Sequence, residues 1–463
     1  MGAGVSSWRL ARAVSSLGQL GVVSGIALDV ILARRLQDGD PDGSVRRAIG
    51  SFPFREIAER AVAKFFVPGG KPKSQPYAMT PMHSARGGRD MDELCMLGNF
   101  VEVFLAREGH DHPVGINYLE KIQLPLLPSI YGAILAGVAV VLIGAGIPIK
   151  IPGVLDLLSA HQPATYDLTV SGPAMDDAPR MAFDPSRYFE GPPLPPLERP
   201  RFLAIVSSNV LATTMLRRAN GRVDGLVVET PTAGGHNAPP RGKLQLDADG
   251  QPVYCDKDRV DLEKLRELNV PFWLAGGYAT PEQLRAALEA GASGVQVGTA
   301  FAFCEESGLA PEHRNAVLND VREGAVAVFT DPLASPTGFP FKVARLEGSL
   351  SETALYESRK RVCDLGYLRQ AYRKPDGSVG FRCPGEPVDV YLAKGGAEAD
   401  TVGRKCLCNA LIANIGHAQQ RADGPELPLL TAGDDLYELS RFLPDGAVTY
   451  SARDVIAHIL DRA

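Results

Sequence analysis

The sequence has 463 residues, of which 45% are hydrophobic and 22% charged, a balance that is typical of a globular protein and excludes a disordered or fibrous chain. Lys and Arg number 48 against 54 Asp and Glu, and the net charge of −6 gives no overall attraction to nucleic acid or to anionic membranes. The 7 cysteines lack the regular spacing of a small secreted domain, so we expect reduced thiols and a cytoplasmic protein.

The only long uncharged run, residues 124–149, has the length of a membrane span. Pro125, Pro128 and Pro148 interrupt it, together with four glycines. The run is therefore interpreted as a buried helix followed by a buried strand, with no membrane contact.

Short apolar strands alternate with helical segments along most of the chain. Continuous Val, Ile and Leu runs of this kind are typical of parallel strands that are buried on both faces. The repeated strand–helix units favour a (β/α)8 TIM barrel within the α/β class, with a doubly wound open sheet as the alternative. Strands are expected within 113–118, 136–146, 165–172, 201–208, 220–230, 271–277 and 290–300, and helices within 129–138, 209–220 and from Pro281, which Thr280 caps.

Residues 1–345 are predicted to form the barrel, and residues 346–463, where the strand–helix rhythm stops, a separate and mainly helical C-terminal cap region. Three segments exceed a minimal barrel, and each is expected at a strand-to-helix connection, where active-site lids lie. These insertions are residues 35–95, 176–200 and 237–260.

Glycine-rich turns follow the last two predicted strands. Gly276 and Gly277 precede the helix at Pro281, and Gly298 precedes Thr299 at the end of the next strand. Backbone amides at such turns bind anions, and a barrel often holds a ligand's phosphate at the loops after its last two strands. The pair of turns indicates a phosphorylated cofactor.

His236 follows Gly234 and Gly235 at the end of the strand GLVVE. Its position at a strand's carboxyl end directs the imidazole into the mouth of a barrel, where a group that titrates near neutrality is a candidate general base. A structural or solvated histidine is the alternative.

The motifs AGGH, AGG and GVQVGTAF, in this order and spacing, resemble the nitronate monooxygenase (2-nitropropane dioxygenase-like) family of FMN-dependent TIM-barrel enzymes. The resemblance extends over roughly residues 1–345, and MGAGVSSWRL at the start is similar to the family's opening cofactor loop. It implies that His236 is the catalytic base and that Glu229 faces the ribityl chain. The other implied FMN-binding residues are Met1, Gly2, Ala3, Gly4, Asn117, Gly234, Gly235, Gly276, Gly277, Gly298 and Thr299.

The resemblance implies an oxidoreductase that oxidises a nitronate or nitroalkane with O2. An alternative is a trans-acting FMN- and NADPH-dependent enoyl reductase that acts on carrier-bound polyketide or fatty-acid intermediates, because the long insertions suit a bulky substrate. A third hypothesis, from another class, is a non-catalytic flavin-binding module. The expected partner is a small-molecule or carrier-bound substrate, and the oligomeric state stays open, with a homodimer as the form considered.

Four cysteines lie beyond the predicted barrel, at Cys363, Cys383, Cys406 and Cys408. Four thiolates can hold zinc or an iron–sulfur cluster, but the spacing lacks the CxxC pairs that are typical of such sites. Free thiols are the favoured interpretation, and the presence of a metal stays open.

Overall fold

A computed structural model of the protein describes residues 2–85, 87–172, 179–192, 194–443 and 446–461. Seven strands form one parallel sheet, in which they follow one another in their order along the chain. The strands are β1 (Gly21–Ser24), β2 (Val114–Leu119), β3 (Val140–Gly144), β7 (Arg201–Val206), β8 (Gly225–Glu229), β10 (Phe272–Ala275) and β11 (Gly294–Gln296).

The strand order separates the two predicted architectures. In a doubly wound sheet the order reverses at a switch point, whereas in a barrel each strand lies beside the next one along the chain. The sequential order β1-β2-β3-β7-β8-β10-β11 confirms the predicted α/β barrel class, with β1 and β11 at the two edges of the hydrogen-bonded sheet.

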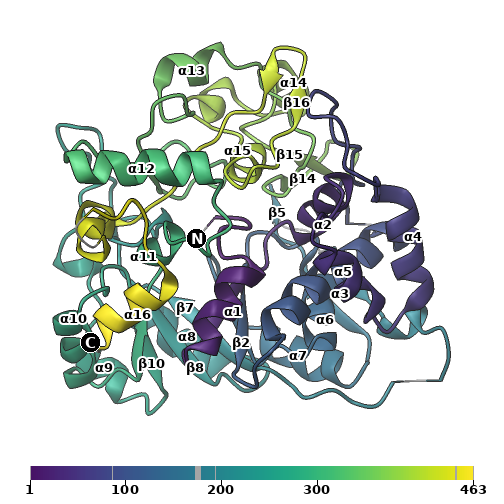
Figure 1. The fold of residues 1–463 in the computed structure, drawn as a ribbon, viewed down its shortest axis with the longest axis horizontal. Coiled ribbons are helices and arrows are strands. Elements are labelled where there is room, and N and C mark those ends of the chain that lie inside the picture. The colour runs from purple at the N-terminus through teal and green to yellow at the C-terminus, as the bar shows by residue number, and fades with distance from the viewer. Residues whose placement is uncertain (1, 86, 173–178, 193, 444–445, 462–463) are drawn as a thin grey trace.

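Helices alternate with the strands (Figure 1). The connection after β1 carries the first predicted insertion, with several helices before β2. The helices of the barrel region are α1 (Trp8–Ser16), α2 (Leu28–Gln37), α3 (Ser44–Gly50), α4 (Arg55–Phe65), α5 (Arg89–Arg107), α6 (Leu126–Leu135), α7 (Ile151–Ser159), α8 (Asn209–Arg218), α9 (Leu262–Arg266), α10 (Pro281–Glu289), α11 (Thr299–Ala302) and α12 (Pro311–Glu323).

The local signals in the sequence account for these elements. All five residues of β3 are buried, as expected for a parallel strand with helices on its outer face and the inside of the curled sheet on its inner face. Helix α10 begins as predicted, because the Thr280 side chain accepts a hydrogen bond from the Gln283 amide while the Gln283 side chain accepts one from the Thr280 amide.

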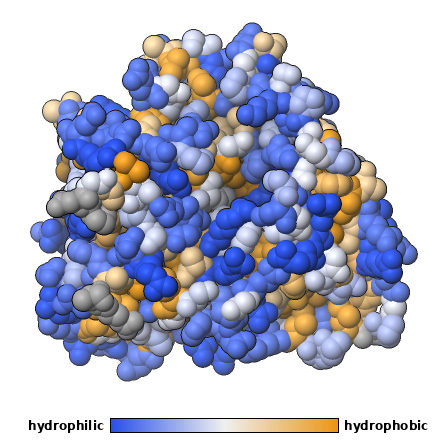
Figure 2. All heavy atoms as spheres, in the orientation of Figure 1, coloured by the Kyte–Doolittle hydropathy of each residue, from blue (hydrophilic) through white to orange (hydrophobic). Residues whose placement is uncertain are grey.

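The uncharged run at 124–149 forms α6 and then β3, so the prediction of a buried helix and a buried strand is confirmed. Among the residues that the structure describes, every helix is too short or too polar to traverse a lipid bilayer. Figure 2 shows hydrophilic residues over most of one face, with smaller hydrophobic areas between them.

The strand expected within 165–172 lies outside the parallel sheet. Its first part, β4 (Ala164–Asp167), pairs with β6 (Arg180–Phe183), and its second part, β5 (Val170–Ser171), pairs with β14 (Gln370–Arg373) of the C-terminal region. The segment after it therefore connects helix α7 to β7. The predicted position of 176–200 after a strand of the barrel is wrong, because an apolar alternation indicates a strand but not its partner; residues 176–178 and 193 lie outside the described part.

A small antiparallel sheet includes the two residues that directly precede the third insertion. It consists of β12 (Val328–Asp331), β13 (Phe341–Ala344) and β9 (Gly235–His236). The insertion 237–260 is loop with one short 3-10 helix, η2 (Asp256–Asp258).

The C-terminal region is built from short pieces that pack on the barrel (Figure 1). Helix α16, for instance, contacts α1, α10 and α11. The elements are α13 (Thr353–Ser358), β14 (Gln370–Arg373), β15 (Val379–Arg382), α14 (Val388–Ala393), η3 (Glu398–Thr401), α15 (Leu407–Ala413), β16 (Gln420–Arg421), β17 (Gly424–Pro425), η4 (Asp434–Phe442) and α16 (Ala452–Ile459). Core clusters of the barrel include residues from both regions, so the two share their hydrophobic packing.

Candidate active site

A cavity of about 910 Å³ lies inside the curled sheet, and each of the seven parallel strands contributes to its wall. Its volume is that of a site for a sizeable small molecule. The strands supply apolar side chains such as Leu142 and Ile205, while polar groups gather where strands end. Ligands of parallel α/β folds bind at these carboxyl ends.

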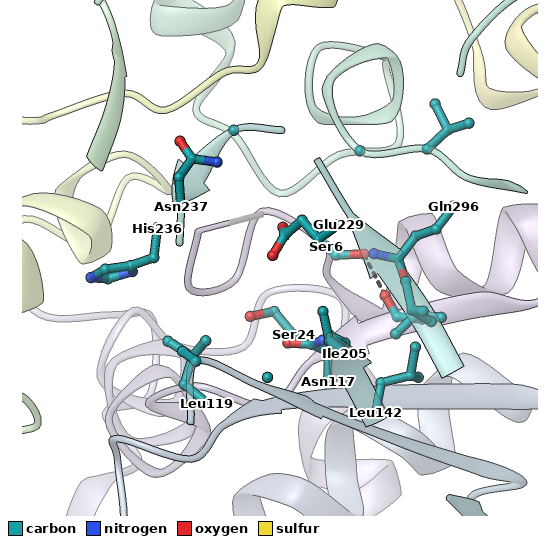
Figure 3. A pocket seen from close by; sticks show the side chains of 18 of the residues that line it. Ser6, Ser24, Asn117, Leu119, Leu142, Ile205, Glu229, His236, Asn237 and Gln296 are labelled. Carbon is teal, nitrogen blue, oxygen red and sulfur yellow. Dashed lines mark hydrogen bonds between the residues drawn. The ribbon is translucent and has the colours of Figure 1, made fainter. Parts of the chain in front are cut away.

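Three polar side chains meet at this end of the sheet. Ser24 is the last residue of β1 and lies beside Asn117 of β2 in the strand register. Glu229 ends β8, and in Figure 3 its carboxylate points toward Ser24 across the cavity. An amide, a hydroxyl and a carboxyl group thus surround one space from three strands.

Burial raises the pKa of Glu229 to about 7. Burial removes water from around the charged carboxylate, so the neutral form is favoured below about pH 7. Glu229 can therefore donate or accept a proton near physiological pH.

His236 is held at the cavity wall by the small antiparallel sheet, in which it pairs with Phe341 of β13. Its Nε2 shares a hydrogen bond of 2.7 Å with Ser335 Oγ, and the Phe341 ring packs edge-on against the imidazole. Burial lowers the pKa of His236 to about 4, so the ring is neutral at pH 7 and able to accept a proton. In Figure 3 the imidazole is turned away from Glu229.

The structure brings together most of the residues that the sequence predicted for a cofactor. Those at the cavity wall are Gly2, Ala3, Asn117, Glu229, Gly234, Gly235, His236 and Gly298. Gly4, Gly276, Gly277 and Thr299 lie outside the described wall of the cavity, and Met1 lies outside the described residues.

The glycine turn after β10 is tightly packed. Gly276 has φ +94°, and a Cβ built on it would lie 2.3 Å from Thr230 Oγ1. The position therefore demands glycine for both backbone conformation and space. The adjoining Gly277 also has positive φ, and its place for a Cβ lies 3.8 Å from Asp435 Oδ1.

A C-terminal loop reaches this turn, a contact that sequence reasoning missed. The Gly433 amide donates to Thr299 Oγ1 at 2.8 Å, and the Asp434 amide donates to the Thr232 carbonyl at 3.0 Å. The Asp434 carboxylate pairs with the buried Lys342 ammonium at 2.6 Å. The predicted phosphate region is thus closed from outside by the chain's own C-terminal part.

A second missed feature is a buried hydrogen-bond chain that leads away from the cavity. The Tyr367 hydroxyl at the cavity wall donates to Asp29 Oδ1, and Asp29 Oδ2 bonds His83 Nε2 at 2.8 Å. Cys95 Sγ lies 3.8 Å from both partners of that second bond. These residues are up to 338 positions apart, so no spacing in the sequence could have indicated the cluster.

Residues 197–331 match the family model described as "Nitronate monooxygenase". These residues run from before β7 to the end of β12 and include Glu229, His236 and the glycine turns. This part of the chain is similar to the nitronate monooxygenase family. The resemblance that the sequence motifs indicated is confirmed for it.

Curated relatives carry the same family name. A "Probable nitronate monooxygenase" of Bacillus subtilis is 45% identical over 114 residues, which cover 25% of this chain and 31% of that protein. A "Nitronate monooxygenase" of Pseudomonas aeruginosa is 37% identical over 129 residues, which cover 27% of this chain and 35% of that protein. The chain thus spans about a third of the length of these nitronate monooxygenases.

Similarity to solved structures is low overall. FabK from Thermotoga maritima has 17% identity and a TM-score of 0.45, with 99% of this chain and 88% of that chain covered. A nitroalkane oxidase from Streptomyces ansochromogenes has 17% identity and a TM-score of 0.44, with coverage of 100% and 94%. The fold assignment rests on the strand order of this chain.

Proposed function

We propose that the protein is an FMN-dependent oxidoreductase of the nitronate monooxygenase type, which oxidises a nitronate or nitroalkane with O2. The observation that carries the proposal is the cavity inside the sheet, where Asn117, Glu229 and His236 meet in a chain with a nitronate monooxygenase segment. FMN would supply the electron acceptor for oxidation of the substrate.

The residues present fit a flavin mononucleotide. The cavity of about 910 Å³ has long apolar walls for a flat ring system and polar side chains where the strands end. Asn117, Gly2 and Ala3 are proposed to hold the ring, with Met1 and Gly4, while Glu229 faces the ribityl chain.

The phosphate end of the cofactor is assigned to the glycine turns. Gly234, Gly235 and Gly298 lie at the cavity wall, and Gly276, Gly277 and Thr299 lie next to them. Their amides offer hydrogen-bond donors to an anion. The C-terminal loop brings the Asp434 carboxylate to this region. The Lys342 ammonium forms an ion pair with that carboxylate and balances its negative charge.

His236 is proposed as the base that removes the acidic proton next to the nitro group. A neutral imidazole accepts a proton directly, and the hydrogen bond between Nε2 and Ser335 leaves Nδ1 as the nitrogen free to take it. The pKa of about 4 keeps the ring neutral over the physiological range.

Anaerobic reduction of the FMN-loaded protein tests this proposal. Addition of a nitronate should bleach the flavin absorption, and His236→Asn should keep the flavin spectrum while a protonated nitroalkane loses its effect. Ser335→Ala is the companion variant, because it leaves the imidazole in place without its hydrogen-bond partner. Full activity of His236→Asn would remove the imidazole from the mechanism.

The size and apolar walls of the cavity favour a second candidate, an enoyl reductase that takes electrons from NADPH. A small nitronate beside a flavin would leave part of this cavity unused, whereas a long acyl chain would bury its apolar surface there. Anaerobic bleaching by NADPH and not by nitronate selects this candidate. A bound flavin that neither compound reduces selects a non-catalytic flavin-binding module.

A further inference from the structure

Three segments of the C-terminal region, far apart in sequence, bring four cysteines to one place. Cys383 and Cys406 are buried, and Cys363 and Cys408 are half-buried. All four are free thiols in the structure. None of them belongs to the cavity residues assigned to the flavin above.

Backbone packing joins the second and third of these segments. The hairpin of β14 and β15 pairs Gln370 with Arg382, so Cys383 directly follows the paired strand. Gly385, two residues on, packs against the next segment, and a Cβ built on it would lie 3.1 Å from the Lys405 carbonyl oxygen. Cys406 is the neighbour of that lysine.

Side-chain hydrogen bonds attach the first segment to the other two. The Asn409 amide group donates to Asp364 Oδ1 at 2.7 Å, which holds the residue after Cys363 against helix α15. The Arg361 guanidinium donates to the Pro384 carbonyl at 3.1 Å and to the Thr401 carbonyl at 2.9 Å. Each segment is thus fixed to both of the others.

The four sulfur atoms lie within electrostatic range of one another. Cys363, Cys383 and Cys408 each interact electrostatically with Cys406, and Cys408 also interacts with Cys363 and Cys383.

Positive charge and unused hydrogen-bonding groups surround the cysteines. Arg369 interacts electrostatically with Cys363, Cys383 and Cys408, and Arg359 interacts with Cys406. Among the described residues, Arg359 Nη2 and Asn409 Oδ1 are buried without a hydrogen-bond partner. The Asn409 side chain also donates to Cys406 Sγ at 3.6 Å. Hydrogen bonds and positive charge of this kind stabilise an anionic metal–thiolate centre.

The spacing distinguishes between metal centres. No three of these four sulfur atoms lie within 4.8 Å of one another, although three thiolates on one zinc ion at about 2.3 Å would. In a [4Fe–4S] cluster each of four cysteines binds a different iron atom, so the cysteine sulfurs stand further apart than on one zinc ion. We propose that Cys363, Cys383, Cys406 and Cys408 ligate a [4Fe–4S] cluster.

The cluster site adjoins the large cavity, because Cys408, Leu368 and Leu411 also line that cavity. Assembly requires two ferrous ions, two ferric ions and four sulfide ions per cluster, and each cysteine loses its thiol proton when its Fe–S bond forms. The inference rests on the C-terminal residues alone and stands whether or not the cavity binds FMN.

Reconstitution of the full-length protein tests the site. Reduced protein is incubated anaerobically with equal amounts of ferrous and ferric iron and with sulfide, and is then desalted. Iron and acid-labile sulfide per chain are measured, together with the visible absorption and the EPR spectrum after reduction with dithionite. We expect both elements to stay bound, a broad charge-transfer absorption, and an EPR signal that appears on reduction.

Two variants give the test its specificity. The double variant Cys383→Ser/Cys406→Ser should lose iron, sulfide and the EPR signal, while Cys255→Ser, which changes an exposed cysteine, should keep them. If the double variant fails to fold, the half-buried Cys408→Ser decides the matter by the loss of the same signals. Three results would each overturn the proposal. These are wild-type protein that retains no iron after desalting, an iron content that is equal in the cysteine variants and in Cys255→Ser, and binding of zinc in place of the cluster.

Discussion

The parallel sheet and the C-terminal region place their side chains at the cavity in different ways. The sheet repeats one unit, in which a buried strand and a helix place a strand end at the cavity, as at Asn117 and Glu229. Residues 346–463 have no such repeat and are attached through individual contacts, such as the pairing of β5 with β14 and the hydrogen bond from Gly433 to Thr299.

The difference shows how chemistry is divided between the two regions. Strand ends carry groups whose backbone positions are fixed by the sheet, whereas the C-terminal region adds side chains from outside, among them Tyr367 and Cys408 at the cavity wall. We therefore expect changes in the sheet to act on the whole fold or on turnover, and changes in the C-terminal contacts to have smaller, local effects.

The largest expected effect is on turnover. His236→Asn should lower the rate with a protonated nitroalkane by about 100-fold or more, because general-base catalysis supplies that much, while FMN stays bound. Steady-state kinetics with the nitroalkane and with its preformed nitronate check this. The variant should lose far less with the nitronate, which has already given up its proton; equal losses with both substrates would contradict the role of a base.

A second effect should appear in stability against pH. The pKa of Glu229 in the folded protein is about 7, above its ordinary value of 4.5, so its contribution to stability falls as the pH rises from about 4.5 to 7. Glu229→Gln should remove this loss and stabilise the protein above pH 7 by up to about 3 kcal/mol. Urea unfolding at about pH 5 and pH 8 measures it, and a gain that is the same at both values would contradict the burial of a titrating carboxyl group.

Helix packing beside the sheet should tolerate no added methyl group at Gly132. A Cβ there would lie 2.1 Å from the Met96 carbonyl oxygen of α5. Gly132→Ala should therefore destabilise the fold by about 1–3 kcal/mol. Gly50→Ala is the matched control, because nothing lies within 4 Å of its Cβ position in helix α3, and it should be neutral or stabilising. Equal denaturation midpoints of the two variants would sink the packing argument.

The smallest effect is expected where the C-terminal loop meets the barrel. Asp434→Asn leaves the Lys342 ammonium, 6% exposed, without its charged partner and should cost about 1–2 kcal/mol. Glu59→Gln breaks the exposed pair with Arg55 and should change stability by less than about 0.5 kcal/mol. Thermal melts of both variants provide the comparison. Equal melting temperatures of the Asp434 and Glu59 variants would mean that the ion pair of the loop does not contribute to stability.

Local sequence patterns predicted the elements that they determine. Apolar runs located six of the seven strands of the sheet, all except β1, and the Thr280 cap located the start of α10, because both signals depend on neighbouring residues. The pattern at 165–172 also indicated strand, but its pairing with β6 and β14 depends on residues elsewhere in the chain.

The candidate site was predictable only in part for the same reason. His236 and the glycine turns follow strands and were found from their positions, whereas Glu229 was implied by the family resemblance. The chain from Tyr367 through Asp29 to His83 joins residues up to 338 positions apart, and the hydrogen bond from Gly433 to Thr299 needs the folded C-terminal region. Sequence spacing contains no signal for contacts of this kind.

The most direct test of the account is flavin binding by the purified protein. FMN is added in excess, free flavin is removed, and the protein is denatured to release and identify what it holds. One FMN per chain, with an absorption spectrum in the folded state that differs from free FMN, is the predicted result. A chain that retains no FMN under these conditions would contradict the assignment of the cavity and the proposed oxidoreductase function with it.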